Sequence, residues 1–309
     1  MLSYMVRNHY KSISNWTSIS QLSKRIKFEI IMENTNARWA FNGSLWNPTM
    51  QEIMAASSYV QEEEIERLSK FHFQNDAKSS LIGRLMIRKY VHLATSIPYE
   101  ELRFSRDERG KPFIVGAGDM PLCFNISHQG DFIVLAGNIS GDIGIDIMKI
   151  EPPVNKDVPD FFRLMKRQYS DHEWSYIRSF KTEMEQIASF YRIWCLKECY
   201  VKNLGCGITV PLNELSFSIH TRQLDIAKAS LDTQLYKCGV LQKDWVFEET
   251  LLDEKHTVAV SVRCADRTKH VPIPYTYLDF EELVKEARPF HEPNSDFSSG
   301  FMKKEFKPF

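Results

Sequence analysis

The sequence predicts an α+β protein built from two similar α/β lobes that meet near residue 145. Helical patterns followed by short strand-like runs occur in both halves of the chain, and a proline-rich turn at residues 151–153 separates the helices of the second half from the strands before them. With 309 residues, of which 43% are hydrophobic and 26% charged, the chain has the size and composition of one large or two modest globular domains.

The folded part of the N-terminal half begins near residue 38. Helices are predicted at residues 61–73 and 76–95, and the second has an apolar face at helical spacing, formed by Leu81, Leu85, Ile87 and Val91. Strands are predicted at residues 112–115, 124–126, 132–137 and 143–147.

The C-terminal half repeats this order. Helices are predicted at residues 160–166, 171–179 and 183–204, and strands at residues 214–219, 245–249 and 257–263. Beyond about residue 270 the chain is rich in proline, serine and lysine, which is typical of a mobile tail. The predicted boundaries are an N-terminal extension at 1–36, an N-terminal lobe at 37–142, a C-terminal lobe at 143–270 and a partly disordered tail at 271–309.

Charge and cysteine usage narrow the class of protein. Lys and Arg number 39 against 40 Asp and Glu, a formal net charge of -1, which argues against a general nucleic-acid-binding protein. No apolar run approaches the roughly 18 residues of a membrane span, so neither nucleic acid nor membrane is expected as a partner. The six cysteines form no C-x-x-C pair, which favours reduced thiols in an intracellular compartment.

The first 28 residues contain no Asp or Glu, but five Lys or Arg lie among several serines. This composition favours either a disordered extension or an organelle transit segment. We therefore expect a cytoplasmic protein and leave a mitochondrial location open.

Residues 106–111 (RDERGK) read as a basic loop. Arg106, Arg109 and Lys111 lie within six residues, and Gly110 permits a tight turn. A flexible loop with Arg and Lys suits a phosphate group. A solvated hairpin turn explains the same string, and the sequence leaves both interpretations open.

The segment FNISHQGD at residues 124–131 reads as a strand that enters a turn. Asn125, Ser127 and His128 offer an amide, a hydroxyl and an imidazole, which could bind an anion or, for Ser127 and His128, belong to a hydrolase. The hydrolase is disfavoured because no G-x-S-x-G motif surrounds the serine and adjacent residues seldom orient as nucleophile and base.

Two carboxylates stand out. Asp146 interrupts a strand otherwise built of isoleucine, where burying an acidic residue is costly, so it needs an Arg or Lys partner or a divalent metal. On the last predicted helix, Glu198 and Lys202 lie four residues apart, so Glu198 is either half of a surface ion pair or a second carboxylate for a shared metal. With the basic loop, these groups suit a Mg²⁺-dependent reaction at a phosphate or pyrophosphate.

Taken in order, F-N-I-S-H, G-I-D-I and W-x-x-K-E-x-x-x-K resemble the motifs of the monomeric, surfactin-type phosphopantetheinyl transferases. Four longer strings resemble most the animal members, which take their name from aminoadipate-semialdehyde dehydrogenase: R-W-A-F, D-A-K-x-x-x-x-G-R-L-M-I-R-K, N-I-S-H-Q-G-D and G-I-D-I-M-K. The similarity covers about residues 37–265.

The resemblance implies a pseudo-twofold pair of lobes with the active site between them. It also implies a Mg²⁺-dependent transfer of the 4′-phosphopantetheine arm of coenzyme A to a serine of an apo acyl-carrier protein or domain, with release of adenosine 3′,5′-bisphosphate. By position, Asp146 and Glu198 would hold Mg²⁺, Glu198 would also be the base, and Lys202 would steady the departing phosphate. The residues that would bind coenzyme A are Arg67, Arg106, Asp107, Glu108, Arg109, Gly110, Lys111, Asn125, Ile126, Ser127, His128 and Asp146.

Three points stay open within this resemblance. Glu63 and Glu64 lie one turn before Arg67 and could pair with it instead. Met148 stands where bacterial members tend to place an acidic residue, and because a thioether is a poor Mg²⁺ ligand we expect water at that position. A non-catalytic coenzyme A or nucleotide-binding module is the alternative function, disfavoured because paired carboxylates repel phosphate unless a cation intervenes.

The partners implied are apo carrier proteins or domains of fatty-acid synthase and of aminoadipate-semialdehyde dehydrogenase-like proteins, served by a monomeric enzyme. Residues 161–167 mix apolar and basic side chains, which would suit the acidic helices of carrier proteins. An ordinary amphipathic helix explains the same composition.

Overall fold

The computed structural model describes residues 35–116, 122–139, 141–205, 207, 210–226 and 228–306. The N-terminal extension predicted at residues 1–36 lies outside the described residues, apart from its last two. Among the helices of the described part, none is long and apolar enough to cross a membrane.

In the described part of the chain, runs of helices are followed by runs of strands, in agreement with the predicted α+β class. The elements before residue 150 are β1 (Ala37–Asn42), α3 (Met50–Ser58), α4 (Glu62–Ser69), α5 (Gln74–Thr95), η1 (Tyr99–Glu101), β2 (Phe104–Arg106), β3 (Pro112–Ile114), β4 (Cys123–Gln129), β5 (Phe132–Asn138) and β6 (Ile143–Lys149). Those after it are α6 (Val158–Met165), η2 (Lys166–Gln168), α7 (Asp171–Arg178), α8 (Glu183–Leu204), η4 (Leu212–Glu214), β7 (Leu215–Ser218), β8 (Gln234–Lys237), β9 (Val240–Leu241), β10 (Trp245–Asp253), β11 (His256–Arg263), η5 (Arg267–Lys269), β12 (Thr276–Leu278), α9 (Phe280–Val284) and α10 (Ser295–Met302).

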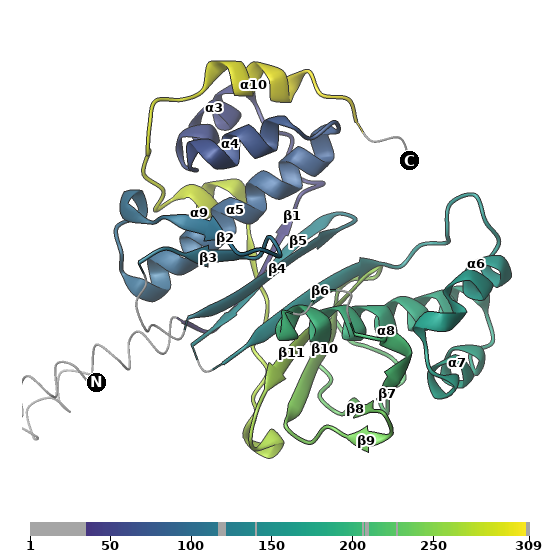
Figure 1. Ribbon diagram of the computed structural model, residues 1–309. Helices are drawn as coiled ribbons and strands as arrows, with labels where there is room; N and C mark the ends of the chain where they lie inside the picture. Colours follow the sequence, from purple (N-terminus) through teal and green to yellow (C-terminus); the bar gives the residue numbers. More distant parts are fainter. Residues whose placement is uncertain are drawn as a thin grey trace, which may run out of the picture.

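The first sheet has the strand order β12-β1-β5-β4. β5 runs antiparallel to both of its neighbours, whereas β12 joins β1 in parallel. Helices α3, α4 and α5 lie together beside this sheet, with α10 outside them (Figure 1). α3 begins with a capping box, in which Thr49 and Glu52 satisfy each other's backbone N–H groups.

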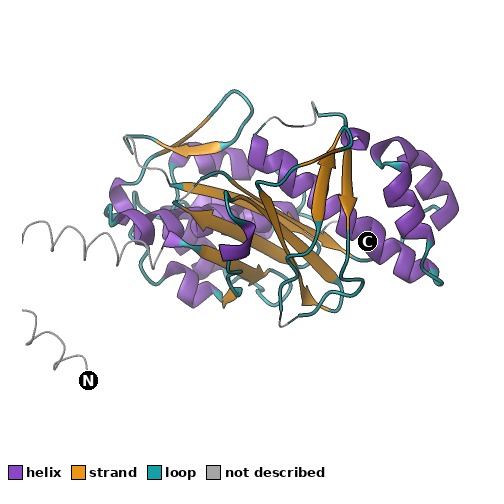
Figure 2. Ribbon diagram, turned by 90° about the horizontal axis from the view of Figure 1, so that it is seen from below, coloured by secondary structure: helices purple, strands orange, loops and turns teal. Residues whose placement is uncertain are grey.

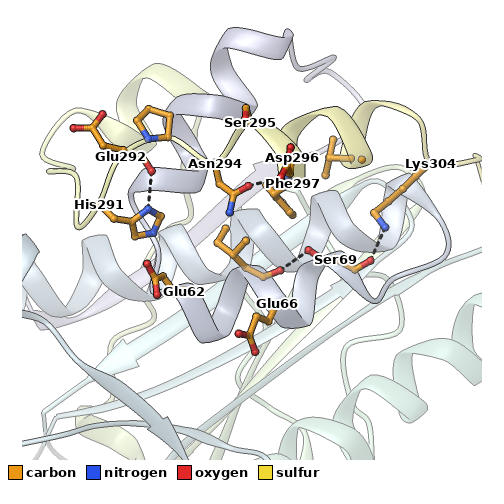
Figure 3. A pocket seen from close by; sticks show the side chains of 14 residues that line it. Glu62, Glu66, Ser69, His291, Glu292, Asn294, Ser295, Asp296, Phe297 and Lys304 are labelled. Atoms are coloured by element: carbon orange, nitrogen blue, oxygen red, sulfur yellow. Dashed lines mark hydrogen bonds between the residues drawn. The ribbon is translucent and has the colours of Figure 1, made fainter.

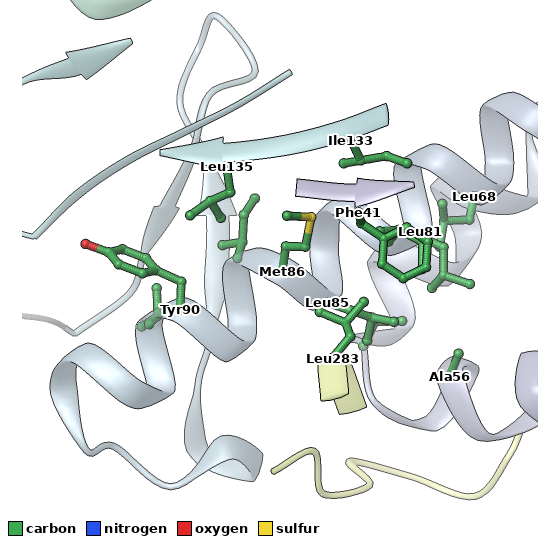
Figure 4. Packing of buried hydrophobic residues seen from close by; sticks show 14 of the residues in the cluster. Phe41, Ala56, Leu68, Leu81, Leu85, Met86, Tyr90, Ile133, Leu135 and Leu283 are labelled. Carbon is green, nitrogen blue, oxygen red and sulfur yellow. The ribbon is translucent and has the colours of Figure 1, made fainter. Parts of the chain in front are cut away.

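The core of this half lies between α5 and the sheet. Met86 of α5 points toward Ile133 and Leu135 of β5, whereas Leu85 lies on the side of the helix beside Leu283 of α9; these side chains are at most 2% exposed (Figure 4). The residues of the predicted apolar face, Leu81, Leu85, Ile87 and Val91, are all buried, but so are the residues between them, so α5 is covered on every side here.

The second sheet has the order β10-β11-β6, antiparallel throughout, and α8 packs along one face of it. The approach of α8 to β6 depends on Gly144, because a Cβ atom there would lie 1.9 Å from the carbonyl oxygen of Cys199. Figure 2 shows the strands crossing the middle of the molecule with helices around them.

Side chains, rather than a backbone ladder, join the two sheets. Asn125 Oδ1 on β4 accepts a hydrogen bond from the backbone N–H of Ile145 on β6 at 3.0 Å, and Gln129 accepts one from the backbone N–H of Lys149. Farther away, buried Arg38 of β1 donates two hydrogen bonds to Glu248 of β10, at 2.8 and 2.7 Å.

The rest of the C-terminal half consists of α6, α7 and the small antiparallel sheet β7-β8-β9. Phe162, Tyr169, Trp174 and Phe190 form an aromatic cluster under α6 and α7. The three helices predicted for this half are present as α6, α7 and α8.

Two expectations about the chain are wrong. The mobile tail beyond residue 270 instead contains β12, α9 and α10, and Phe297 and Phe301 of α10 are buried in the core of the first half. Their apolar side chains fill a groove made by distant helices, which composition does not reveal. Residues 127–129, expected in a turn, continue strand β4.

Candidate active site

Asp146, the acidic residue within the isoleucine-rich strand, is buried at the junction of β4, β6 and α8. Its Oδ1 atom accepts hydrogen bonds from Ser127 Oγ at 2.8 Å and from Lys202 Nζ at 2.6 Å. Its Oδ2 atom is buried and has no hydrogen-bond partner among the described residues. Of the two alternatives predicted for Asp146, a basic partner or a divalent metal, the basic partner is present as Lys202 on Oδ1, while Oδ2 has no partner among the described residues.

Glu198 and Lys202 come from α8, a 22-residue helix whose ends are well defined. Thr182 and Glu185 form a capping box at its start, and Gly205 ends it in the left-handed conformation. Glu198 is half-buried and has no hydrogen bond or ion pair within the described part of the chain. The surface ion pair between Glu198 and Lys202 is therefore not formed, because Lys202 reaches Asp146 instead.

The electrostatics tie Glu198 to the same site. Burial raises the pKa of the Glu198 carboxyl, the negative charge of Asp146 raises it further, and Lys202 opposes both. A carboxylate with these neighbours is a stronger proton acceptor than an exposed glutamate, which suits a general base.

Ser127 and His128 do not act on each other. Neighbouring residues of a strand point to opposite faces, and Ser127 contacts Asp146 and Lys202. Burial lowers the pKa of His128, and the charge of Lys202 lowers it further. No contact supports the hydrolase interpretation of this pair.

The basic loop is the turn of the β2–β3 hairpin. Asp107 Oδ1 accepts hydrogen bonds from the backbone N–H groups of Arg109 and Lys111, at 2.9 and 2.8 Å, and Gly110 takes the positive φ of +81° that the turn requires. Arg109 donates to the carbonyl oxygen of Gly205, at the end of α8. Glu108 and Lys111 are exposed, and their side chains have no partner within the described residues.

Arg67, Arg106, Ile126 and His128 meet at a cavity of about 410 Å³ between α4, α5, β4 and the hairpin. A second cavity of about 260 Å³ adjoins it and shares Arg67 and Arg106. Arg67 has no ion pair within the described residues, so the expected competition from Glu63 and Glu64 is absent. Residue spacing does not reveal Arg84 and Glu64 as members of this cavity, although Arg84 stands in the G-R-L-M-I-R string.

A larger cavity lies elsewhere. It has a volume of about 740 Å³ and is enclosed by α4 and the C-terminal segment, with Glu62 and Glu66 on one wall and His291 and Glu292 on another (Figure 3). None of the predicted site residues lines it.

The residues present fit a divalent cation of the Mg²⁺ type. Within the described part of the chain no group of three or more His, Cys, Asp or Glu side chains gathers as a metal site. Two carboxylates suffice, however, since Mg²⁺ usually takes one or two and completes its shell with water and phosphate oxygens. The unpaired Oδ2 atom of Asp146 is one such oxygen, and the Glu198 carboxyl, on which the charge of Asp146 acts, is the candidate for the second.

Two buried cysteines near this site are not candidate metal ligands. Burial raises the pKa of both thiols, Cys195 and Cys199, well above the ordinary value, and their S–H groups donate to backbone carbonyls. They are small core residues at the interface of α8 and β6.

Two family models together match most of the described chain. The model of the N-terminal part of 4′-phosphopantetheinyl transferase matches residues 44–140, and the model of the 4′-phosphopantetheinyl transferase superfamily matches residues 142–261. The protein is thus an enzyme of the transferase class.

Curated relatives agree with the family models. The L-aminoadipate-semialdehyde dehydrogenase-phosphopantetheinyl transferase of Homo sapiens is 38% identical over 285 residues, which cover 88% of this chain and 92% of the relative. The 4′-phosphopantetheinyl transferase Sfp of Bacillus subtilis is 32% identical over 163 residues, which cover 53% and 68%. The chain belongs to the phosphopantetheinyl transferase family.

Proposed function

We propose that this chain transfers the 4′-phosphopantetheine arm of coenzyme A to a serine of apo acyl-carrier proteins, with release of adenosine 3′,5′-bisphosphate. The observation that carries this proposal is the pairing of Asp146 with Lys202 beside Glu198, next to a cavity lined by arginines. These groups supply a metal-binding oxygen pair, a base and an anion site within one region.

In this proposal the two halves are similar lobes related by a pseudo-twofold axis, and the reaction takes place between them. The contact of Ser127 on β4 with Asp146 on β6 supports a site at this junction. So does the contact of Arg109 on the hairpin with Gly205 after α8.

Asp146 and Glu198 would hold Mg²⁺, which when bound neutralises charge on the diphosphate. Glu198 takes the proton from the carrier serine, whose oxygen bonds to the phosphorus on the pantetheine side. The bond from that phosphorus to the bridging oxygen breaks, and adenosine 3′,5′-bisphosphate leaves with the oxygen. Lys202 steadies the leaving phosphate, and Ser127 orients Asp146 and Lys202.

The remaining site residues bind coenzyme A. Arg67, Arg106 and His128 line the cavity, whereas Arg109 and Lys111 present cations on the hairpin. Asp107 and Gly110 shape the turn, Asn125 holds β6, and Ile126 is part of the cavity wall. Glu108 completes the hairpin sequence without a side-chain contact among the described residues.

The carrier protein is the less defined partner. The name of the human relative supports an aminoadipate-semialdehyde dehydrogenase-like carrier, and fatty-acid synthase is the other carrier we propose, for a monomeric enzyme in cytoplasm or mitochondria. Leu164 and Arg163 on α6 are exposed, 59% for the leucine, which supports docking of an acidic carrier helix there.

Mass spectrometry of an apo acyl-carrier protein, incubated with the chain, coenzyme A and Mg²⁺, tests this function. The expected result is a mass gain of one phosphopantetheine, which disappears with Glu198→Gln. Glu183→Gln, an exposed glutamate in the first turn of α8, is the matched control and keeps full activity. Transfer by the Glu198→Gln variant at the rate of the original chain would refute the assignment of the base.

A further inference from the structure

Four arginines face a single glutamate in the cavity beside His128. Arg67, Arg84, Arg88 and Arg106 line it, together with Glu64. Burial lowers the pKa of His128, so its imidazole adds no full positive charge at neutral pH. The four guanidinium groups therefore determine the charge of the cavity, because their positive charges outnumber the single negative charge of Glu64.

Glu64 and Arg88 belong to the frame of the cavity. Glu64 lies 3.3 Å from Arg88 and also 3.3 Å from Arg84. Arg88 donates to Gln61 at 2.8 Å and lies over the ring of Phe104 at 5.1 Å, although its Nε atom, like that of Arg84, is buried without a hydrogen bond within the described residues. Arg88 therefore connects α5 to α4 and to β2.

Arg84 has a different set of contacts. One terminal nitrogen, Nη1, donates to the carbonyl and the hydroxyl oxygen of Ser80, one turn earlier on α5. Its Nε atom is buried without a hydrogen bond, although Glu64 lies 3.3 Å away. The side chain is 10% exposed, and its other terminal nitrogen makes no hydrogen bond within the described residues.

The guanidinium groups of the cavity repel one another. The pKa of Arg84 is lowered to about 10, chiefly by burial and also by the charges of Arg106 and Arg67, while Glu64 opposes the shift. Arg67 and Arg106 have no carboxylate partner among the described residues. An anion with two charges would relieve the repulsion among these three guanidinium groups.

We propose that Arg84, held by Ser80 and Glu64, is a specificity-determining residue that binds the phosphomonoester on the ribose of coenzyme A together with Arg67 and Arg106. This inference rests on coenzyme A being the donor. His128 lines the cavity, and the charges of Lys202 and Asp146 act on its imidazole, so the cavity lies near the carboxylate site where the diphosphate would react. A second, separate phosphate group is the part of the donor that can occupy it.

The test compares the affinity for coenzyme A with that for 3′-dephospho-coenzyme A by titration calorimetry, with Mg²⁺ and without carrier. The original chain is expected to prefer coenzyme A. Arg84→Gln reduces that preference about tenfold or more, the worth of a charge-assisted hydrogen bond, and leaves binding of the dephospho form little changed. Arg263→Gln removes the same charge from an exposed arginine of β11 and is the matched control.

The Glu64→Gln variant distinguishes a ligand-binding role of Arg84 from a purely structural role, because the two roles predict opposite changes in the affinity for coenzyme A. If Arg84 binds phosphate, removing the nearby carboxylate tightens coenzyme A binding, since Ser80 still holds the guanidinium. A chain whose ligand preference is unchanged by Arg84→Gln, or which loses both ligands equally, overturns the inference while transferase activity stands. Failure of the original chain to bind coenzyme A at all contradicts the proposed function instead.

Discussion

Lys197, inside the W-x-x-K-E-x-x-x-K motif, is predicted to stabilise the fold rather than touch the substrate. Its side chain is fully buried, and Nζ lies 2.9 Å from Glu173, which is also fully buried. Nζ also donates to the carbonyl oxygens of Leu212 and Leu215, at 2.7 and 2.6 Å. These contacts fasten α8 to α7 and to the segment that enters β7.

Replacing Lys197 by Met leaves the Glu173 carboxylate buried without its partner. Breaking a buried ion pair from one side costs about 3–5 kcal/mol, whereas replacing both partners is often nearly neutral. We therefore expect Lys197→Met to lower the free energy of unfolding by about 3–5 kcal/mol. The double variant Lys197→Met with Glu173→Gln recovers much of that loss, because no uncompensated charge remains.

Urea unfolding followed by tryptophan fluorescence measures this cycle, with all four proteins at the same pH and ionic strength. The coupling between the two sites is the difference between the double variant and the sum of the single variants. A Lys197→Met variant within about 1 kcal/mol of the original chain would show that the pair is not the anchor of α8. A double variant as unstable as the sum of the single ones would refute the charge argument.

Three further predictions concern packing and charge. Gly144→Ala forces α8 away from β6, so it should abolish transfer and lower the stability of the fold. Gly300→Ala should change neither, because no atom lies within 4 Å of the added Cβ. Thermal unfolding measures the stability of both variants, and the mass assay measures their transfer activity. Phe301→Ala, in the C-terminal helix, should cost about 3–5 kcal/mol in urea unfolding because the ring is 0% exposed, whereas Phe306→Ala, at 67% exposed, should be close to neutral. Although burial acts in the opposite direction, the charge of Arg38 and then His270 lower the pKa of Glu248 below its ordinary 4.5. The Glu248 carboxylate therefore stabilises the fold above pH 4.5, and this stabilisation decreases as the pH falls below that value. The Glu248→Gln variant should be less stable than the original chain at pH 7, and its stability should depend less on pH near 4.

Periodicity predicts the long helices well. α5 and α8 appear almost where the sequence predicts them, because each is a long helix buried against a sheet and its neighbouring elements. Strands β5 and β6 also follow from short apolar runs bounded by turns. The local sequence pattern is sufficient to predict an element whose buried residues lie within that element's own stretch of sequence.

The C-terminal segment shows where local pattern fails. Phe297 and Phe301 lie in a stretch rich in serine and proline, whose average polarity predicts no core. They are buried because α3, α4 and α5 leave a groove that α10 fills, a contact between parts of the chain more than 200 residues apart. Such long-range burial is invisible to composition.

Helix spacing also does not predict the ion-pair partners of Glu64. The rule for residues three apart on a helix pairs it with Arg67, yet its partners are Arg84 and Arg88 of the next helix. The buried pairs prevail because desolvated charges gain more from a partner than exposed ones. Arg67 is left facing the cavity without a carboxylate of its own among the described residues.

The W-x-x-K-E-x-x-x-K motif contains one residue with a structural role, Lys197, and two candidate site residues, Glu198 and Lys202. Successive residues of a helix point about 100° apart, so Lys197 and Glu198 cannot face the same neighbour. Lys197 is directed into the ion pair with Glu173, while Glu198 and Lys202, four residues apart, share the face toward Asp146. The anchor fixes the rotation of α8 about its own axis, and that rotation determines whether Glu198 and Lys202 meet the carboxylate of the strand. In the proposed function, the buried ion pair of Lys197 therefore sets the position of the two residues that carry the chemistry.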